Sequence, residues 1–313
     1  ETLLTEKNFF AIVAHDSAEK KLAPHISKLE ELGLTELAQL GTREAYVAYK
    51  ETYGISEERH PKSVSVTLPY KPSSSQNKKV LAKETKRFIA HAGGQIDGNN
   101  YTNSLEAMNL SYANGFRLFE LDLLKTSDGT YVAAHDWNVW KKHTGYKGET
   151  PVSERTFLQY KIKDLYTPLN LKRINAWFKS HPDAFLITDK VNDPKDFSSK
   201  FIDKSRLTME LFSVKAIEEA QGLGITMMPT QNMVDQIKGN VVEQLKTWNA
   251  QYIAISRRKI AERTELLLQL KDAGIKTYVY HVNFDKGKDE KYVFNYEFDF
   301  IYGMYADRWD FGK

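Results

Sequence analysis

The feature that most constrains the fold is a regular alternation of strand-like and helix-like runs from residue 79 to residue 313. The strand-like runs are short, apolar and bounded by turn residues, at 88–91, 117–122, 130–135, 185–189, 207–212, 225–228, 251–255, 275–280 and 299–303. Apolar residues at helical spacing lie between many of them, at about 104–113, 171–180, 214–222, 232–247 and 260–273. Such alternation is typical of parallel α/β folds and predicts a TIM-type (β/α)8 barrel.

There is one strand candidate more than the eight strands of such a barrel. The runs 117–122 and 130–135 are separated by a Ser127-Asp128-Gly129 turn. This connection is too short for the helical crossover that two parallel strands need. One of these two runs is therefore predicted to be the antiparallel partner of a hairpin.

The first part of the chain has a different pattern. Strand-like runs at 8–14, 45–49 and 64–68 and a helical pattern at 17–32 predict a small α/β domain. The segment 71–86 is polar and rich in Ser and Lys, as linkers often are. We place a boundary near residue 78, which gives a small domain over 1–78 and a barrel over 79–313.

Composition excludes several classes of function. Lysine and arginine total 44 against 41 acidic residues, a net charge of +3 that gives no argument for a nucleic-acid partner. The absence of cysteine excludes disulfides and thiolate sites. No apolar run approaches the roughly 20 residues of a membrane span. Because the chain starts at Glu1, a processed or shortened start is expected, with a secreted, periplasmic or cell-envelope location favoured.

Acidic and imidazole groups gather at the predicted carboxyl ends of the strands. Glu120 and Asp122 alternate with apolar residues, so they project from one face of their strand. Two carboxylates on an apolar strand are costly unless a cation lies between them, and a divalent metal is the simplest such cation. His91 and His135 end two other strands and can exchange protons near neutral pH. Asp189 ends a further strand at the same predicted mouth of the barrel.

The motifs IAHAGG, YTNSLEA, FELDLLKTSDG and VAAHD, in this order, are similar to the pattern of the glycerophosphodiester phosphodiesterase family. FLITDK, TYVYHVN and DFIYGMYADRW resemble later segments of that family. The superfamily also holds bacterial phosphatidylinositol phospholipases C and spider sphingomyelinases D. The resemblance implies a TIM barrel that cleaves phosphodiesters, either small molecules, lipid headgroups or a surface glycopolymer.

Carried over by residue, the resemblance implies one divalent ion held by Glu120, Asp122 and Asp189. His91 and His135 become the acid–base pair, and Lys190 a cation that faces the phosphate. A ligand set of carboxylates without cysteine favours Ca²⁺ or Mg²⁺. The implied function is a metal-dependent phosphodiester hydrolase acting on glycerol- or sugar-linked diesters.

Three departures from the family pattern keep alternatives open. Ala92 stands where an arginine usually follows the first histidine, and Thr102 stands where a glutamate is usual. The later acidic position is Asp189, directly followed by Lys190. Since adjacent strand residues point to opposite faces, either the strand end bends or Lys190 lies outside the site. A lyase that forms a cyclic phosphate and a degenerate barrel that only binds remain alternatives.

Other polar groups near strand ends are candidates for substrate binding. These are Asn103, Glu210 and His281. Asn103 is equally suited to cap the helix that starts near Ser104. The basic run 257–259 is expected to be a solvated helix start.

The first domain has a resemblance of its own. The segments FFAIVAHDSAEKKLAPHISKLEELG and REAYVAYK resemble the interleukin-like module of the FAM3 cytokine family. This resemblance implies a binding or positioning role for residues 1–78, with a protein or glycan partner, and no catalytic residue.

Overall fold

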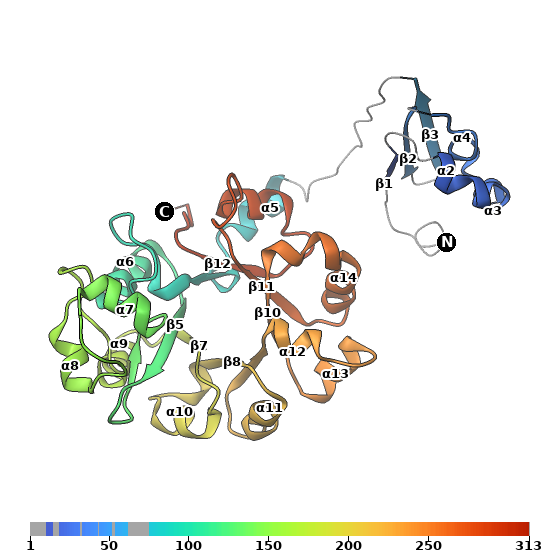
Figure 1. Cartoon of the computed structure of the whole chain (residues 1–313). Helices are drawn as coiled ribbons and strands as arrows, with labels where there is room; N and C mark the ends of the chain where they lie inside the picture. Colours follow the sequence, from blue (N-terminus) through green and yellow to red (C-terminus); the bar gives the residue numbers. More distant parts are fainter. Residues whose placement is uncertain are drawn as a thin grey trace. The chain divides into compact units, whose positions relative to one another are not determined.

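A computed structural model describes residues 11–14, 19–31, 33–42, 44–51, 54–61 and 75–312. The chain divides into two compact units, Glu1–Pro72 and Ser73–Lys313 (Figure 1). The predicted boundary near residue 78 lies inside α5 (Ser75–Leu81), the first helix of the second unit.

The first unit contains an antiparallel sheet in the order β1-β2-β3. Its strands are β1 (Ala11–Ala14), β2 (Ala45–Glu51) and β3 (Gly54–His60). Tyr46 and Ala48 of β2 are buried against leucines of the helical segment, including Leu34, Leu37 and Leu40. The sheet agrees with the expected α/β class, and the likeness to an interleukin-like module stays a prediction.

The helix expected over 17–32 and the strand expected at 64–68 are not found as predicted among the described residues. The helix expected over 17–32 is broken into α2 (Glu19–Leu22), a 3₁₀ turn (Ala23–His25) and α3 (Ile26–Glu31). Pro24 explains the break, because proline has no N–H to continue helical hydrogen bonding. A further short helix, α4 (Thr35–Ala38), follows. The strand predicted at 64–68 lies outside the described residues, and β3 was not expected.

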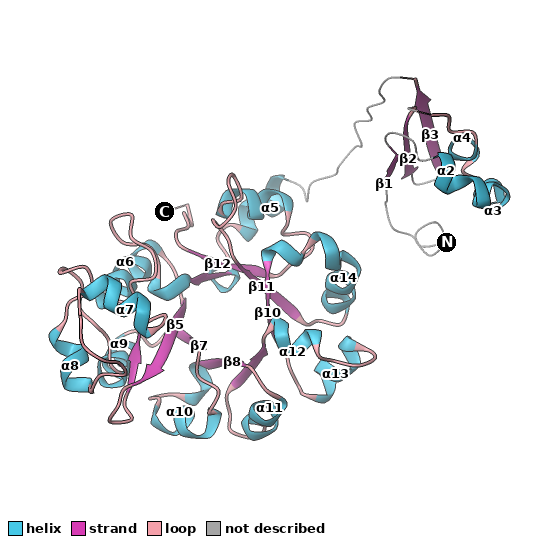
Figure 2. Ribbon diagram, in the orientation of Figure 1, coloured by secondary structure: helices cyan, strands magenta, loops and turns pink. Residues whose placement is uncertain are grey.

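The second unit is built on one sheet of parallel strands in the order β10-β11-β12-β4-β5-β7-β8-β9. Its parallel strands are β4 (Phe88–Ala90), β5 (Leu118–Lys125), β7 (Phe185–Asp189), β8 (Leu207–Leu211), β9 (Thr226–Pro229), β10 (Tyr252–Ser256), β11 (Lys276–Tyr280) and β12 (Gly303–Ala306). The strands form a ring with the helices outside it (Figure 2). Within 75–312, β9 and β10 are joined only by a bridge between Thr230 and Ala254, so the barrel is nearly closed.

The helices of this unit mostly follow the strands that they cover. Beside α5 they are α6 (Leu105–Asn114), α7 (Trp137–Thr144), α8 (Glu154–Gln159), α9 (Leu171–Ser180), α10 (Pro194–Lys200), α11 (Val214–Ala220), α12 (Gln231–Asp235), α13 (Val241–Thr247), α14 (Thr264–Asp272) and α15 (Glu290–Tyr296). Short 3₁₀ turns lie at Thr85–Arg87, His91–Gly93, Lys204–Arg206, Arg257–Lys259 and Ala261–Arg263. No described helix has the length and apolar character needed to span a membrane.

The predicted barrel and its hairpin are confirmed. β6 (Tyr131–Ala133) pairs antiparallel with the end of β5 and lies off the ring. It is therefore the strand candidate that exceeded the eight strands of the barrel. The single helix predicted at 232–247 is wrong, because Gly239 adopts a left-handed φ of 97° between α12 and α13. The last strand begins at Gly303, whereas the apolar run suggested 299–303.

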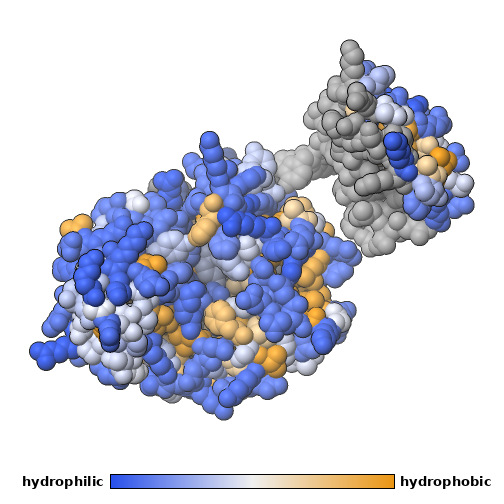
Figure 3. Space-filling model, viewed as in Figure 1, coloured by the Kyte–Doolittle hydropathy of each residue, from blue (hydrophilic) through white to orange (hydrophobic). Residues whose placement is uncertain are grey.

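Two apolar layers hold the barrel together. Inside the ring, Ile89, Ile187, Met228 and Ala254 form a compact cluster with tyrosines. A larger cluster lies between the strands and the outer helices. The outer surface seen in Figure 3 is mainly hydrophilic, with smaller hydrophobic patches toward the lower centre of the view. The polar groups at the carboxyl ends of the strands therefore stand on a rigid, close-packed base.

Candidate active site

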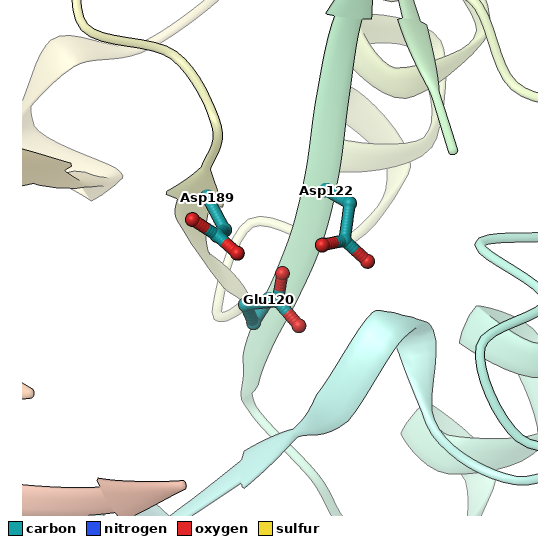
Figure 4. Close-up of side chains that lie close together, drawn as sticks. All are labelled: Glu120, Asp122 and Asp189. Carbon is teal, nitrogen blue, oxygen red and sulfur yellow. The ribbon is translucent and has the colours of Figure 1, made fainter. Parts of the chain in front are cut away.

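Three carboxylates from two neighbouring strands converge at the carboxyl end of the barrel (Figure 4). Glu120 and Asp122 alternate along β5, and Asp189 is the last residue of β7. The parallel register pairs Asp122 with Asp189, and Glu120 lies two residues earlier on the same face of β5. One oxygen of each group lies within 4.8 Å of the others. The predicted ligand residues are thus together in space.

The cluster is strongly disfavoured in its charged form without a cation. Glu120 and Asp122 are only 2% and 3% exposed. Burial, followed by the neighbouring charge of Asp122, raises the pKa of Glu120 well above its usual value. Burial and the charge of Asp189 raise the pKa of Asp122. A positive ion among these oxygens would remove both the repulsion and much of the desolvation cost.

Glu120 presents one satisfied and one unsatisfied oxygen. Its Oε2 accepts a hydrogen bond of 2.7 Å from the backbone N–H of Ala92. Its Oε1 is buried and has no hydrogen-bond partner. A buried carboxylate oxygen without a partner is costly. The structure therefore offers a hard oxygen ligand with nothing to bind except an ion or water.

The turn after β4 supplies that N–H. Ala92 adopts a left-handed φ of 48°, and the next two residues are glycines that also have positive φ. A side chain at Gly94 would place a Cβ atom 2.0 Å from Ser111 Oγ. The His-Ala-Gly-Gly sequence thus folds tightly against α6 and directs a backbone donor at Glu120.

Asn103 supports Asp122. Its Nδ2 donates to Asp122 Oδ2 over 3.0 Å, and its Oδ1 accepts from the backbone N–H of Asp122 over 3.1 Å. Asn103 is fully buried, and both ends of its amide contact Asp122, so the side chain orients that carboxylate. The suggestion that Asn103 caps α6 is wrong, because Ser104 accepts from Ala107 N as the N-cap.

Lys190 lies in the site because the strand end bends. Its φ of 68° is left-handed, which ends the alternation of β7. Its Nζ lies 2.8 Å from Asp189 Oδ2 and 3.9 Å from Asp122 Oδ1. Burial lowers the pKa of Lys190, but the charge and hydrogen bond of Asp189 and the charge of Asp122 together outweigh it and raise the pKa above its usual value. Of the two expected alternatives, a bent strand end or a Lys190 outside the site, the structure has the bent strand end. Lys190 is therefore a cation beside the carboxylates.

His91 is held from behind by a buried carboxylate. Its Nδ1 lies 3.4 Å from Asp307 Oδ1, and Asp307 is 7% exposed. Asp307 Oδ2 accepts hydrogen bonds from Asn100 Nδ2 and Asn283 Nδ2 at 2.7 and 3.1 Å. These contacts fix the orientation of the carboxylate and, through it, of the imidazole.

His135 has an analogous partner on the other side of the site. Its Nδ1 lies 2.8 Å from Asp136 Oδ2. The Tyr101 ring lies edge-on to both imidazoles, with centroids 4.7 Å from His91 and 5.6 Å from His135. The two histidines therefore contact the same tyrosine ring, each with Nδ1 beside an aspartate.

Glu210 and His281 occupy two other strand ends of the barrel. Glu210 is buried and accepts a hydrogen bond of 2.5 Å from Tyr305 Oη. Burial raises its pKa well above the usual value. His281 Nδ1 lies 2.9 Å from Ser256 Oγ, and its ring is partly exposed. Glu210 is thus part of a buried pair, while His281 stands at the surface of the mouth.

One expected solvated segment is buried. Arg257, within the basic run 257–259, is only 8% exposed and pairs with Asp285 and Glu297. The expectation of a solvated helix start was wrong for this residue, because its charge is neutralised by two carboxylates.

Sequence reasoning missed Asp307 and Tyr101. Asp307 directly follows β12, so the strand-end rule that selected His91 and Asp189 also selects it once that strand is correctly bounded. Tyr101 lies in the loop between the 3₁₀ turn His91–Gly93 and α6 with a left-handed φ of 58°, and no local pattern indicates its position.

The fold and the site define a (β/α)8 barrel with an acidic cluster, a lysine and His91 at the carboxyl ends of its strands, and with His135 after the hairpin strand β6. Residues 96–181 match the model of the glycerophosphoryl diester phosphodiesterase family, a segment that contains Glu120, Asp122 and His135. The family match and the barrel together support a phosphodiesterase. A search of curated proteins finds no match.

Solved structures share the fold at low sequence identity. A glycerophosphoryl diester phosphodiesterase from Parabacteroides distasonis aligns with a TM-score of 0.57 at 13% identity, over 77% of this chain and 90% of that one. A glycerophosphodiester phosphodiesterase from Agrobacterium tumefaciens aligns with a TM-score of 0.53 at 16% identity, over 72% and 96%. An Oleispira antarctica phosphodiesterase in complex with the product sn-glycerol-3-phosphate aligns with a TM-score of 0.56 at 16% identity, over 71% and 92%.

Proposed function

We propose that the protein is a metal-dependent phosphodiester hydrolase that acts on glycerol- or sugar-linked diesters. The observation that carries the proposal is that two imidazoles, His91 and His135, contact one tyrosine and act electrostatically on Asp122, a member of a cluster of buried carboxylates with an unpartnered oxygen. The family match over residues 96–181 and the solved relative with sn-glycerol-3-phosphate support the substrate class.

Glu120, Asp122 and Asp189 would hold the ion. Three carboxylates without sulfur or nitrogen ligands fit Ca²⁺ or Mg²⁺. The Glu120 side chain lies close to Asp122 and Asp189 (Figure 4), and its Oε1 has no hydrogen-bond partner. When bound, such an ion neutralises the charge of the phosphodiester and of the groups around it. Lys190 adds a positive charge of the protein's own beside Asp189, which would attract a phosphate group to the site.

The imidazoles carry the protons. In each histidine Nδ1 lies beside an aspartate, which leaves Nε2 as the nitrogen for exchange with the substrate. One imidazole removes the proton from the attacking water, and the other protonates the alkoxide as its bond to phosphorus breaks. The products are then a phosphomonoester and an alcohol. The aspartates stabilise each imidazolium as it forms.

The test is time-resolved phosphorus NMR of glycerophosphodiester cleavage by the metal-loaded protein. We expect the monoester to form directly, and His91→Ala and His135→Ala each to lower kcat by roughly 10²- to 10⁴-fold. A cyclic phosphate as the first product would instead indicate the lyase reaction. Turnover that survives both substitutions and chelation would contradict the proposal.

A further inference from the structure

Phe284 is an exposed aromatic residue next to His281 and Tyr101. It is 48% exposed, in the loop between β11 and α15. Its ring centroid lies 4.7 Å from that of His281 and 6.4 Å from that of Tyr101. The same Tyr101 ring contacts both His91 and His135. An exposed apolar ring is therefore only one side chain away from the two imidazoles.

The loop that carries Phe284 is fixed on both sides of it. Asp285 forms ion pairs with buried Arg257 and with Arg258, whose side chain is half exposed. Asn283 donates hydrogen bonds to Glu290 Oε1 and Asp307 Oδ2. Leaving a large apolar ring in water is unfavourable. These anchors nevertheless hold the ring at the mouth, which suits a surface formed in advance for a ligand.

His281 adds a polar group next to this ring. Its Nδ1 lies 2.9 Å from Oγ of Ser256, a buried residue at the end of β10. Ser256 Oγ accepts from the backbone N–H of Arg258, so the hydroxyl proton is available to His281 Nδ1. Burial, with the charge of Arg258, lowers the pKa of His281 and favours the neutral ring. A neutral imidazole that accepts at Nδ1 carries its proton on Nε2.

We propose that Phe284 and His281 form a subsite for a sugar ring attached to the phosphodiester. A sugar presents an apolar C–H face and an edge of hydroxyl groups, which match an exposed aromatic ring beside a neutral hydrogen-bond donor. Acyclic alcohols such as glycerol or ethanolamine have no such face. This inference rests on the proposed function and narrows its substrate class to diesters of ring polyols.

The experiment compares two diesters that share a glycerol phosphate group. One carries glucose through its 6-hydroxyl group, and the other carries ethanolamine. For the wild-type protein we expect a higher kcat/KM on the glucose diester. Phe284→Ala should raise KM for the glucose diester by roughly three- to ten-fold, with little effect on the ethanolamine diester. Phe284→Trp should retain the preference.

Of two further variants, one tests the role of His281 and the other is a control. His281→Asn keeps a residue type that tolerates the φ of 60° at this position, yet it shortens the donor. It should raise KM for the glucose diester only. Tyr296→Ala removes another exposed aromatic side chain, which is 61% exposed on α15. It should leave KM for both diesters unchanged.

The outcomes separate the two proposals. Equal use of both diesters, or an equal loss on both in Phe284→Ala, would overturn the sugar subsite and leave the phosphodiesterase intact. Turnover of neither diester would contradict the proposed function. In that case saturation-transfer NMR of the glucose diester decides the subsite: signal lost in Phe284→Ala supports it, and unchanged signal overturns it.

Discussion

Asp122 and Asp189 lie directly opposite each other on adjacent parallel strands. Neighbouring strands are spaced about 4.8 Å apart, which brings two registered carboxylates within reach of one ion. Side chains on the same face of β5 repeat every second residue, so Glu120 joins the pair from below. A three-ligand site thus follows from one strand pairing and one strand alternation.

Binding of Ca²⁺ or Mg²⁺ should stabilise the protein, and more so at high pH. An ion at a hundred times its Kd stabilises by about 2.7 kcal/mol. Burial raises the pKa of Glu120 and Asp122, so protons compete with the ion as the pH falls. The gain in Tm on adding the ion should be larger at pH 8 than at pH 5, as differential scanning fluorimetry can measure.

The control for this experiment is a pair of matched variants. Asp189→Asn should abolish most of the gain in Tm, while Asp164→Asn alters an exposed carboxylate and should leave it unchanged. A gain of the same size in both variants would show that the ion binds elsewhere.

Asn103→Gly should weaken metal binding through Asp122. Glycine tolerates the φ of 47° at this position but removes both side-chain hydrogen bonds to Asp122. Loss of such outer contacts typically lowers metal affinity by about 10- to 100-fold. The metal concentration for half-maximal activity should rise accordingly, with most of kcat recovered at saturation.

Ser104→Ala serves as its neighbour control. It removes the N-cap of α6 and should cost about 1 kcal/mol of stability. The metal requirement of this variant should stay that of the wild type. A raised requirement there would mean that general loosening of α6, and not Asp122, explains the effect of Asn103→Gly.

Asp307→Asn should lower kcat without changing KM. The carboxylate faces His91 Nδ1, and the amide cannot stabilise the imidazolium in the same way. We expect a loss of roughly 10²-fold or more and a displaced limb of the pH–rate profile. Asp310→Asn, three residues further along, is the control. An unchanged pH profile in Asp307→Asn would assign Asp307 a structural role only.

Glu210→Gln should alter the pH dependence of stability. Burial raises the folded-state pKa of Glu210 above its unfolded value. The contribution of this carboxyl is therefore fully present below the unfolded pKa and is lost as the pH rises through the folded pKa. Gln still accepts a hydrogen bond from Tyr305 but does not ionise. Urea unfolding should show the variant gaining stability relative to wild type between pH 5 and pH 8, and a constant difference would refute this.

The barrel and its acidic residues could be predicted because their causes are local. Glu120 and Asp122 interrupt an apolar run at a spacing of two, and this pattern determines their common face. The position of Lys190 could not be predicted in the same way. Its left-handed backbone turns the ammonium group toward Asp189 and Asp122, and no pattern among its sequence neighbours marks this residue for a positive φ.

Residues in loops were the hardest to place. The Tyr101 ring contacts both His91 and His135, which are far apart in the sequence, and nothing in its sequence neighbours indicates this. Arg257 looked like a solvated charge because its partners, Asp285 and Glu297, follow much later in the chain. Pairing between distant charges depends on tertiary structure, so a local pattern carries no signal for it.

The single bridge between Thr230 and Ala254 makes the β9–β10 seam the least hydrogen-bonded junction around the ring. Local opening proceeds most easily where backbone bonds are few, so amide exchange with deuterium should be fastest along this seam. The ligands of the acidic cluster belong to β5 and β7, which are paired with each other along their full overlap. The ring can thus fluctuate at its seam while the geometry of its ion-binding strands stays constant.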